Sequence, residues 1–392
     1  MPLEPVTILH TTAHLGTGGI ARIVLRTAAG LAPERFRSLV CHLTPHNDFE
    51  EECRRLGLAP VCAGHRRPWH GPRTVARLVR LLRRHRVELV HTHHPLDRLY
   101  AGLAARIAGV PVVITLHNTT PPSRPARGLR RRLGLASTGS LGDRWTVRTA
   151  ARFVAVSEAV LRAQAAYLGV PPERTVVVHP GVDSEEIARP VPEPELRALR
   201  TALDLGTGPV LLHVGRLHEQ KGQEHLVTAM PRILGRHPDA ALLIAGEGEE
   251  RPRLETLIHR LGLERSVRLL GHRSDVSALL ALADLFVFPS VHKEGLPVAV
   301  VEASAAGLPV VAARTAPLEE AVEDGVTGLL VPPRDSGALA AAACRLLGDP
   351  DRRSAMGRAG RRRAAERFSL AASVERLEGL YREVLAERGG HG

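Results

Sequence analysis

The feature that most restricts the fold of this chain is a repeated alternation of short apolar segments with longer amphipathic ones. Residues 38–43, 89–92 and 112–116 are short runs rich in Val, Ile and Leu, and helical patterns separate them. Strands that alternate with helices pair in parallel, because each helix carries the chain back to the same end of the sheet. The sequence therefore predicts an α/β protein with open parallel sheets and helices on both faces.

The alternation occurs in two series. The first begins with a strand at 5–10 and ends with one at 175–178, and the second runs from 210–214 to 328–331. A chain of 392 residues is also too long for one ordinary hydrophobic core, which favours two domains. We predict a first Rossmann-like domain over residues 1–183, a linker over 184–206, a second Rossmann-like domain over 207–368 and a C-terminal helix over 369–392.

Two glutamates eight residues apart follow a buried strand predicted at 285–289. Glu294 lies in the loop that leaves this strand, and Pro297 suits the first position of the next helix, so Glu302 falls more than one turn into it. The free N–H groups of the first helical turn and the helix dipole favour an anion such as phosphate. The stretch is therefore suited to a ligand that carries both phosphates and hydroxyls.

A glycine-rich turn, Gly16-Thr17-Gly18-Gly19, follows the first predicted strand. Glycines between a strand and a helix allow the backbone to approach a phosphate at the helix N-terminus. The spacing differs from the G-x-G-x-x-G of dinucleotide-binding folds, and no acidic residue closes a convincing second strand. The turn is a candidate phosphate-binding loop, and a dinucleotide site is disfavoured.

The stretch Gly215–Gly222, after the strand at 210–214, carries Arg216 and Lys221. A guanidinium and an ammonium group five residues apart can bind two phosphates and offset the negative charge that grows on a leaving group. Lys221 and Lys293 are the only lysines among 53 basic residues, so a lysine here indicates a geometric demand. The alternative is a basic pair on the surface, which the position after a strand disfavours.

Several protein classes are disfavoured by the composition. No segment has the run of about 18 uncharged apolar residues that a membrane-spanning helix requires. The N-terminus lacks the basic region and long apolar core of a signal peptide. The four cysteines show neither metal-binding spacing nor a disulfide pattern, so we expect reduced core residues in a cytoplasmic protein. These cysteines are Cys41, Cys53, Cys62 and Cys344.

Two other stretches might suggest a metal, and we take neither as a metal site. His91, His93 and His94 cluster at the end of a predicted strand. Asp349-Pro350-Asp351 has the form D-x-D, but it falls in a turn between helices, where aspartate commonly caps the next helix. The sequence analysis therefore predicts no metal.

These motifs, in this order, resemble those of the family-4 retaining glycosyltransferases with the GT-B fold. Glu294 and Glu302 match the E-x7-E signature, Gly215–Gly222 matches G-R-L-x-x-x-K-G, and Gly18-Gly19 matches the family's G-G loop. The resemblance covers nearly the whole chain. It implies two facing Rossmann-like domains with a cleft between them, and a C-terminal helix that crosses back to the first domain.

The resemblance also implies a reaction: transfer of a hexosyl-type sugar from a nucleoside diphosphate sugar to an acceptor hydroxyl, with retention of configuration. It implies that Arg216 and Lys221 hold the diphosphate, that Glu302 binds the ribose and that Glu294 binds the sugar. His117, which follows the strand at 112–116, would contact the donor sugar. The implied catalytic residues are His117, Arg216, Lys221 and Glu294, and the implied donor-binding residues are Gly18, Gly19, Arg216, Lys221, His272, Glu294, Gly295, Leu296 and Glu302.

Substrates and mechanism follow from the same resemblance. The family needs no cofactor, the donor would carry UDP or GDP, and the acceptor would be a carbohydrate or lipid-linked molecule in polysaccharide or glycolipid synthesis. No residue presents itself as a nucleophile, so front-face substitution is expected and double displacement through a carboxylate is the alternative. A catalytically silent scaffold that binds nucleotide-sugars is the alternative function. Nucleic-acid binding is disfavoured, because reader motifs and stacking aromatics are lacking.

The positive charge is concentrated in the first half of the chain. Residues 1–182 hold 26 arginines against 11 acidic residues, whereas residues 183–392 hold 27 basic residues against 30 acidic ones. Arginines recur at helical spacing in residues 73–86, opposite apolar residues, and the stretch 121–144 reads as a basic loop that includes Arg124 to Arg132. A basic amphipathic helix is typical of membrane-surface binding and favours a peripheral contact with anionic lipid at the inner face of the membrane. The alternative is a solvated basic face in an arginine-rich protein.

Overall fold

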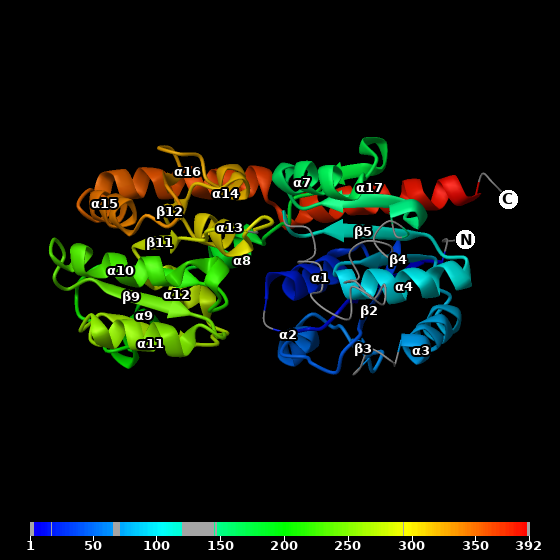
Figure 1. Cartoon of the computed structure of the whole chain (residues 1–392), viewed down its shortest axis with the longest axis horizontal. Helices are drawn as coiled ribbons and strands as arrows, with labels where there is room; N and C mark the ends of the chain where they lie inside the picture. Colours follow the sequence, from blue (N-terminus) through cyan, green and yellow to red (C-terminus); the bar gives the residue numbers. More distant parts are fainter. Residues whose placement is uncertain are drawn as a thin grey trace, which may run out of the picture. The chain divides into compact units, whose positions relative to one another are not determined.

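The computed structural model describes residues 4–16, 18–65, 71–119, 145, 147–292 and 294–389. The chain divides into two compact units (Figure 1). The first comprises the chain up to Gly181 together with the residues from Leu370 onward, and the second comprises Val182–Ser369. The predicted basic loop at 121–144 and Lys293 lie outside the described residues.

The first unit is built on a parallel sheet. Seven strands run in the spatial order β3, β2, β1, β4, β5, β6, β7, and every described pair is parallel. The chain starts near the middle of this sheet and builds outward in both directions, so the order reverses between β1 and β4. The strands are β1 (Val6–Thr12), β2 (Phe36–His42), β3 (Val61–Cys62), β4 (Leu89–Thr92), β5 (Val112–Leu116), β6 (Arg152–Ala155) and β7 (Thr175–Val177).

Helices cover both faces of this sheet. They are α1 (Gly19–Gly30), α2 (Glu50–Arg55), α3 (Gly71–Arg84), α4 (Pro95–Ala108), α7 (Glu158–Leu168) and α17 (Leu370–Gly389). Alternate residues of a strand point to opposite faces. Leu9 of β1 therefore packs in the core shared with α3, α4 and α7, whereas Ile8 packs in the core shared with α17. Val40 of β2 packs with α1 and α2.

The last helix of the chain packs on the first unit. Tyr381 of α17 is fully buried, and its hydroxyl lies 2.6 Å from Nδ1 of His91 on β4. Glu378 accepts a hydrogen bond of 2.8 Å from the backbone N–H of Ala32 and pairs with Arg35 at 2.8 Å. The segment expected to cross back to the first domain is thus part of its core.

The second unit is also built on a parallel sheet. Its six strands run in the spatial order β10, β9, β8, β11, β12, β13. Its strands are β8 (Val210–Val214), β9 (Ala241–Ala245), β10 (Val267–Gly271), β11 (Leu285–Phe288), β12 (Val310–Ala313) and β13 (Gly328–Val331). Its helices are α8 (Ser184–Ile187), α9 (Glu193–Ala202), α10 (Gln223–Leu234), α11 (Arg251–Arg260), α12 (Val276–Leu282), α13 (Val298–Ala305), α14 (Ala316–Ala321), α15 (Ser336–Leu347) and α16 (Pro350–Arg367). Helices α10, α11 and α15 pack on one face, and α12, α13 and α14 pack on the other.

Several details differ from the sequence-based expectations. The structure assigns residues 184–206 to the second unit, where Leu199 and Leu203 pack against its core, rather than to a linker. Pro297 is the N-cap of α13 and not its first residue. The short strand β3 was not expected, because its two residues are exposed and carry no apolar pattern beyond Val61.

Other local predictions are confirmed. Asp349 of the D-x-D stretch caps α16 by accepting the N–H of Arg352 at 2.9 Å. The arginines of α3 lie on its exposed face, opposite the buried Leu78 and Leu82. Among the described helices, none combines the length and the hydrophobicity needed to cross a bilayer.

Candidate active site

The predicted donor-binding residues of the second unit gather where the order of its strands reverses. Strands β8 and β11 are neighbours in the sheet, although β9 and β10 lie between them in the sequence. Loops that leave the carboxyl ends of two such strands diverge, and open α/β sheets bind ligands in the crevice between them. Here these two loops carry Arg216 and Lys221 after β8, and Glu294 after β11.

A glycine allows the loop after β8 to lie close to the end of β11. A short 3-10 turn, Glu219–Lys221, leads into Gly222, which has a φ of 66°. A Cβ at this position would lie 2.4 Å from the carbonyl oxygen of Pro289, so only glycine allows the two loops to approach this closely. The backbone N–H of Val291 then donates to the carbonyl of Gln220 at 2.9 Å.

Lys221 and Glu294 form a direct ion pair across these two loops. The Lys221 Nζ lies 2.8 Å from Oε1 and 3.0 Å from Oε2 of Glu294. The Glu294 side chain is almost completely buried, and Oε1 also accepts from Nε2 of Gln220 at 3.1 Å and from the hydroxyl of Ser290. The Lys221 ammonium group also stands 5.0 Å from the centre of the Phe288 ring. Glu294 is thereby surrounded by donors that hold its charge in place.

The buried histidine His213 also helps to stabilise this loop. His213 of β8 lies 2.9 Å, through Nδ1, from the carbonyl oxygen of Val287, so Nδ1 must carry the proton. Its Nε2 is therefore the acceptor for Nε2 of Gln223, at 3.3 Å, and the same amide donates to the carbonyl of Arg216 at 2.8 Å. Burial lowers the pKa of His213 to about 4, so this network contains a neutral imidazole at physiological pH.

The remaining predicted residues of the second unit come from α13, from the segment that leads into it, from the loop after β8 and from the loop after β10. Glu302 is buried on α13, and Gly295 and Leu296 are buried in the approach to that helix. His272, in the loop after β10, and Arg216 are exposed. An exposed arginine beside a fixed lysine is free to meet a ligand, whereas Glu302 is held on a helix.

The first unit holds the other predicted residues. Gly18 and Gly19 are exposed at the start of α1, and no heavy atom of the described chain lies within 4 Å of a Cβ built on either. His117 follows β5 and is buried, and its Nε2 lies 3.2 Å from Nδ1 of His93. Burial lowers the pKa of His117 to about 3, so its ring is neutral. The packing of this unit does not by itself require glycine at positions 18 and 19.

Sequence reasoning missed four residues of this arrangement: Gln220, Ser290, His213 and Gln223. Three of them stand within two residues of a motif residue, and that proximity was the only signal available. The importance of Gln220, Ser290 and His213 depends on contacts between segments about 70 residues apart, which no local pattern reports.

Comparisons with known proteins identify the family. The family model described as Glycosyltransferase Family 4 matches residues 17–186, and the model described as Glycosyl transferases group 1 matches residues 198–363. An alpha-D-kanosaminyltransferase of Streptomyces kanamyceticus is 31% identical over 289 residues, which is 73% of this chain and 74% of that protein. A GDP-mannose-dependent alpha-(1-6)-phosphatidylinositol monomannoside mannosyltransferase of Mycobacterium tuberculosis is 33% identical over 326 residues, or 80% of each.

A solved structure has the same fold. The crystal structure of the Anabaena protein HepE in complex with UDP and glucose superposes with a TM-score of 0.82. It is 25% identical in sequence, and the match covers 96% of this chain and all of that one. Taken with the two parallel sheets and the family matches, these similarities show that the chain belongs to the family-4 glycosyltransferases and has the GT-B fold.

Proposed function

We propose that this glycosyltransferase moves a sugar from a nucleoside diphosphate sugar to an acceptor hydroxyl with retention of anomeric configuration. The observation that carries the proposal is the ion pair of Lys221 with Glu294, at the point where the strand order reverses and in a loop that also carries Arg216. We assign binding of the diphosphate to Arg216 and Lys221. Glu302 would accept hydrogen bonds from the ribose hydroxyls. Glu294 and the backbone at Gly295 and Leu296 would bind the donor sugar.

UDP or GDP is the proposed nucleotide of the donor. The related Anabaena structure holds UDP and glucose, while the related mycobacterial enzyme is named for its dependence on GDP-mannose. Both donors offer the same diphosphate to a guanidinium and an ammonium group, so the basic pair alone does not distinguish them. The base and the sugar would be selected by the residues around His272 and Glu302.

Front-face substitution is the mechanism that best suits this site. The bond between the anomeric carbon and the leaving phosphate oxygen breaks while the acceptor oxygen bonds to the same face, and the acceptor proton passes to the leaving phosphate. Lys221 offsets the charge that grows on that phosphate. Double displacement would need a free carboxylate nucleophile, and the carboxylate of Glu294 is already engaged by Lys221, Gln220 and Ser290.

The test is a screen of UDP- and GDP-sugars with the full chain. Binding is followed by thermal stabilisation, which rises with ligand concentration relative to its dissociation constant. Turnover is followed by release of the nucleoside diphosphate, and the anomeric configuration of the product by NMR. Inversion of configuration would overturn the retaining mechanism. Stabilisation by a donor without turnover, over a broad acceptor panel, would support the silent scaffold instead.

A contact with anionic membrane is proposed for the first unit. Arg73, Arg80 and Arg84 lie on the exposed face of α3, and the related mycobacterial enzyme is named for a phosphatidylinositol-based acceptor. Each arginine near an anionic leaflet adds about 1 kcal/mol of binding. Replacing all three by glutamine should weaken co-sedimentation with anionic vesicles on the order of a hundredfold.

The control for the membrane experiment removes equal charge from the second unit. Arg345, Arg358 and Arg362 are also exposed, and their replacement by glutamine should leave vesicle binding nearly unchanged. Wild-type binding should also fall as salt is added, because the attraction fades within about 8–10 Å at moderate ionic strength. Equal losses in both triple variants, or binding insensitive to lipid charge, would favour a soluble acceptor.

A further inference from the structure

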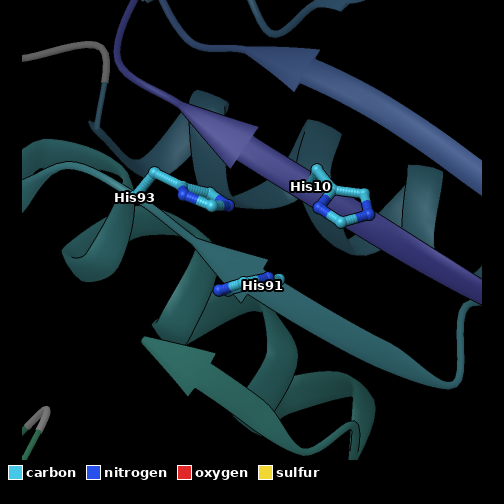
Figure 2. A group of neighbouring side chains, drawn as sticks. All are labelled: His10, His91 and His93. Carbon is cyan, nitrogen blue, oxygen red and sulfur yellow. The ribbon is translucent and has the colours of Figure 1, made fainter. Parts of the chain in front are cut away.

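A cluster of three histidines lies where the strand order of the first unit reverses. His10 of β1 and His91 of β4 are paired in register, and His93 follows β4 directly, so all three side chains meet on one face of the sheet (Figure 2). The three residues are almost fully buried. One ring nitrogen of each lies within 4.8 Å of those of the other two, and the rings of His91 and His93 have centroids 4.2 Å apart.

Three nitrogens of this cluster are unpaired. Within the described residues, neither ring nitrogen of His10 has a hydrogen-bond partner, and neither does Nε2 of His93. Buried polar atoms are paired in the great majority of native structures. Several unpaired lone pairs that converge in one place are typical of a site that binds an ion or another polar ligand.

His91 and His93 also contact neighbouring side chains through their ring nitrogens, as metal-binding histidines usually do. His93 contacts Nε2 of His117 through Nδ1 at 3.2 Å, which leaves Nε2 of His93 to point elsewhere. His91 contacts the Tyr381 hydroxyl through Nδ1 and the Thr115 hydroxyl through Nε2, both at 2.6 Å. Metal-binding histidines commonly donate their second N–H to such a partner, which fixes the ring orientation.

We propose that His10, His91 and His93 bind a divalent transition-metal ion, with zinc as the ion that three imidazoles favour. Imidazole nitrogen is a preferred ligand of zinc, and zinc sites with three histidines keep a fourth position for water. His91 would exchange one of its two hydroxyl partners for the metal. The buried side chain of Asp97 accepts the backbone N–H of His93 at 2.9 Å and so helps to fix the position of that histidine.

We assign this site a structural role, and the assignment does not rest on the proposed sugar transfer. The ion would link the side chains of β1 to those of β4, its parallel neighbour in the sheet. Through His91 and Tyr381 it would also fasten α17 to the sheet, and through His93 it would fix the ring of His117. Loss of the ion should therefore loosen the first unit first.

The experiment uses the full chain without a histidine tag, expressed with zinc or cobalt in the medium. After gel filtration, elemental analysis should find about one metal ion per chain, and the cobalt protein should show the visible absorption of a tetrahedral site. Treatment with EDTA should lower the melting temperature, and added zinc should restore it, because a ligand that binds only the folded state stabilises it.

A matched pair of variants separates this site from surface binding. His10→Leu removes one ligand and should lose the bound metal and the zinc-dependent rise in melting temperature. His259→Leu removes an exposed histidine, whose side chain is 86% accessible, and should keep both. Only trace metal in the wild type, with no metal-dependent change in its melting temperature, would overturn the proposal even if His10→Leu failed to fold. Equal metal content in both variants would reveal an adventitious ion only.

Discussion

The ammonium group of Lys221 donates to both carboxylate oxygens of Glu294, at 2.8 and 3.0 Å, although the two residues are 73 positions apart in the chain. The pair joins the loop after β8 to the loop after β11, and Gln220 and Ser290 strengthen the same junction. The charges of the candidate site are therefore positioned by the protein before a substrate arrives. Such prearrangement lowers the reorganisation needed when charge develops in the transition state.

Lys221→Ala should lower turnover more than it weakens donor binding. In the proposed mechanism the lysine charge offsets the negative charge that grows on the leaving phosphate in the transition state, and loss of one such contact commonly costs about a hundredfold in rate. Steady-state kinetics with the identified donor and acceptor measure kcat and KM separately. A raised KM with unchanged kcat would reduce Lys221 to a ground-state anchor.

Glu302→Gln should weaken the binding of the free nucleoside diphosphate by about 1.5–3 kcal/mol, the range for a hydrogen bond to a charged group. The substitution keeps the size of this buried side chain and removes its charge. Glu319→Gln on α14, a half-exposed glutamate of the same unit, is the control and should bind like wild type. Titration calorimetry that shows equal affinity for Glu302→Gln and wild type would remove Glu302 from the nucleotide site.

Gly19→Ala should keep the fold and reduce activity. A Cβ there meets nothing within 4 Å in the described chain, and alanine is a better helix former at the start of α1, so the melting temperature should hold or rise. If the donor or acceptor lies against this turn, the added methyl should lower kcat/KM by about tenfold or more. Gly206→Ala, equally open, is the control. Full activity in Gly19→Ala would place the substrates away from this turn.

Gln223→Leu should destabilise the second unit and loosen the Arg216 loop. The substitution is close in size and leaves the Arg216 carbonyl and Nε2 of His213 without their donor, and each buried group left unpaired costs about 1–3 kcal/mol. We expect a lower melting temperature and weaker donor affinity. A stability loss with unchanged affinity would mean that the network supports the core without positioning Arg216.

The stability of the protein should fall as the pH drops from about 6.5 to about 4, in part because of His213. Burial lowers the pKa of His213 to about 4 in the folded chain, whereas an unfolded histidine titrates near 6.5. Between these two pH values the unfolded state binds a proton that the folded state does not bind. The free energy of unfolding therefore falls by about 3 kcal/mol over this range, and protonation of His213 lowers it no further at lower pH. His213→Gln should lose correspondingly less across the same range in denaturant titrations. Parallel curves for the two proteins would contradict this assignment.

Short-range patterns in the sequence determined much of the architecture. The strand at Leu89–Thr92 and the aspartate cap at Asp349 depend on residues within a few positions, so they could be predicted closely. The family motifs around Arg216, Lys221, Glu294 and Glu302 are also local strings, and their positions at strand ends follow from the alternation. The two α/β sheets and the family itself were therefore accessible from the sequence.

Tertiary structure alone decided which of these segments meet. The contacts of Lys221 with Glu294 and of His213 with Val287 exist because β8 and β11 are neighbours, and the meeting of His10 with His91 exists because β1 pairs with β4. Strand order and register are set by packing over the whole domain. Because side chains alternate between the two faces of a sheet, a one-residue slip in register would turn these side chains to the opposite face. The same long-range packing placed Leu199 against the core of the second unit, in a segment that was predicted to be a linker.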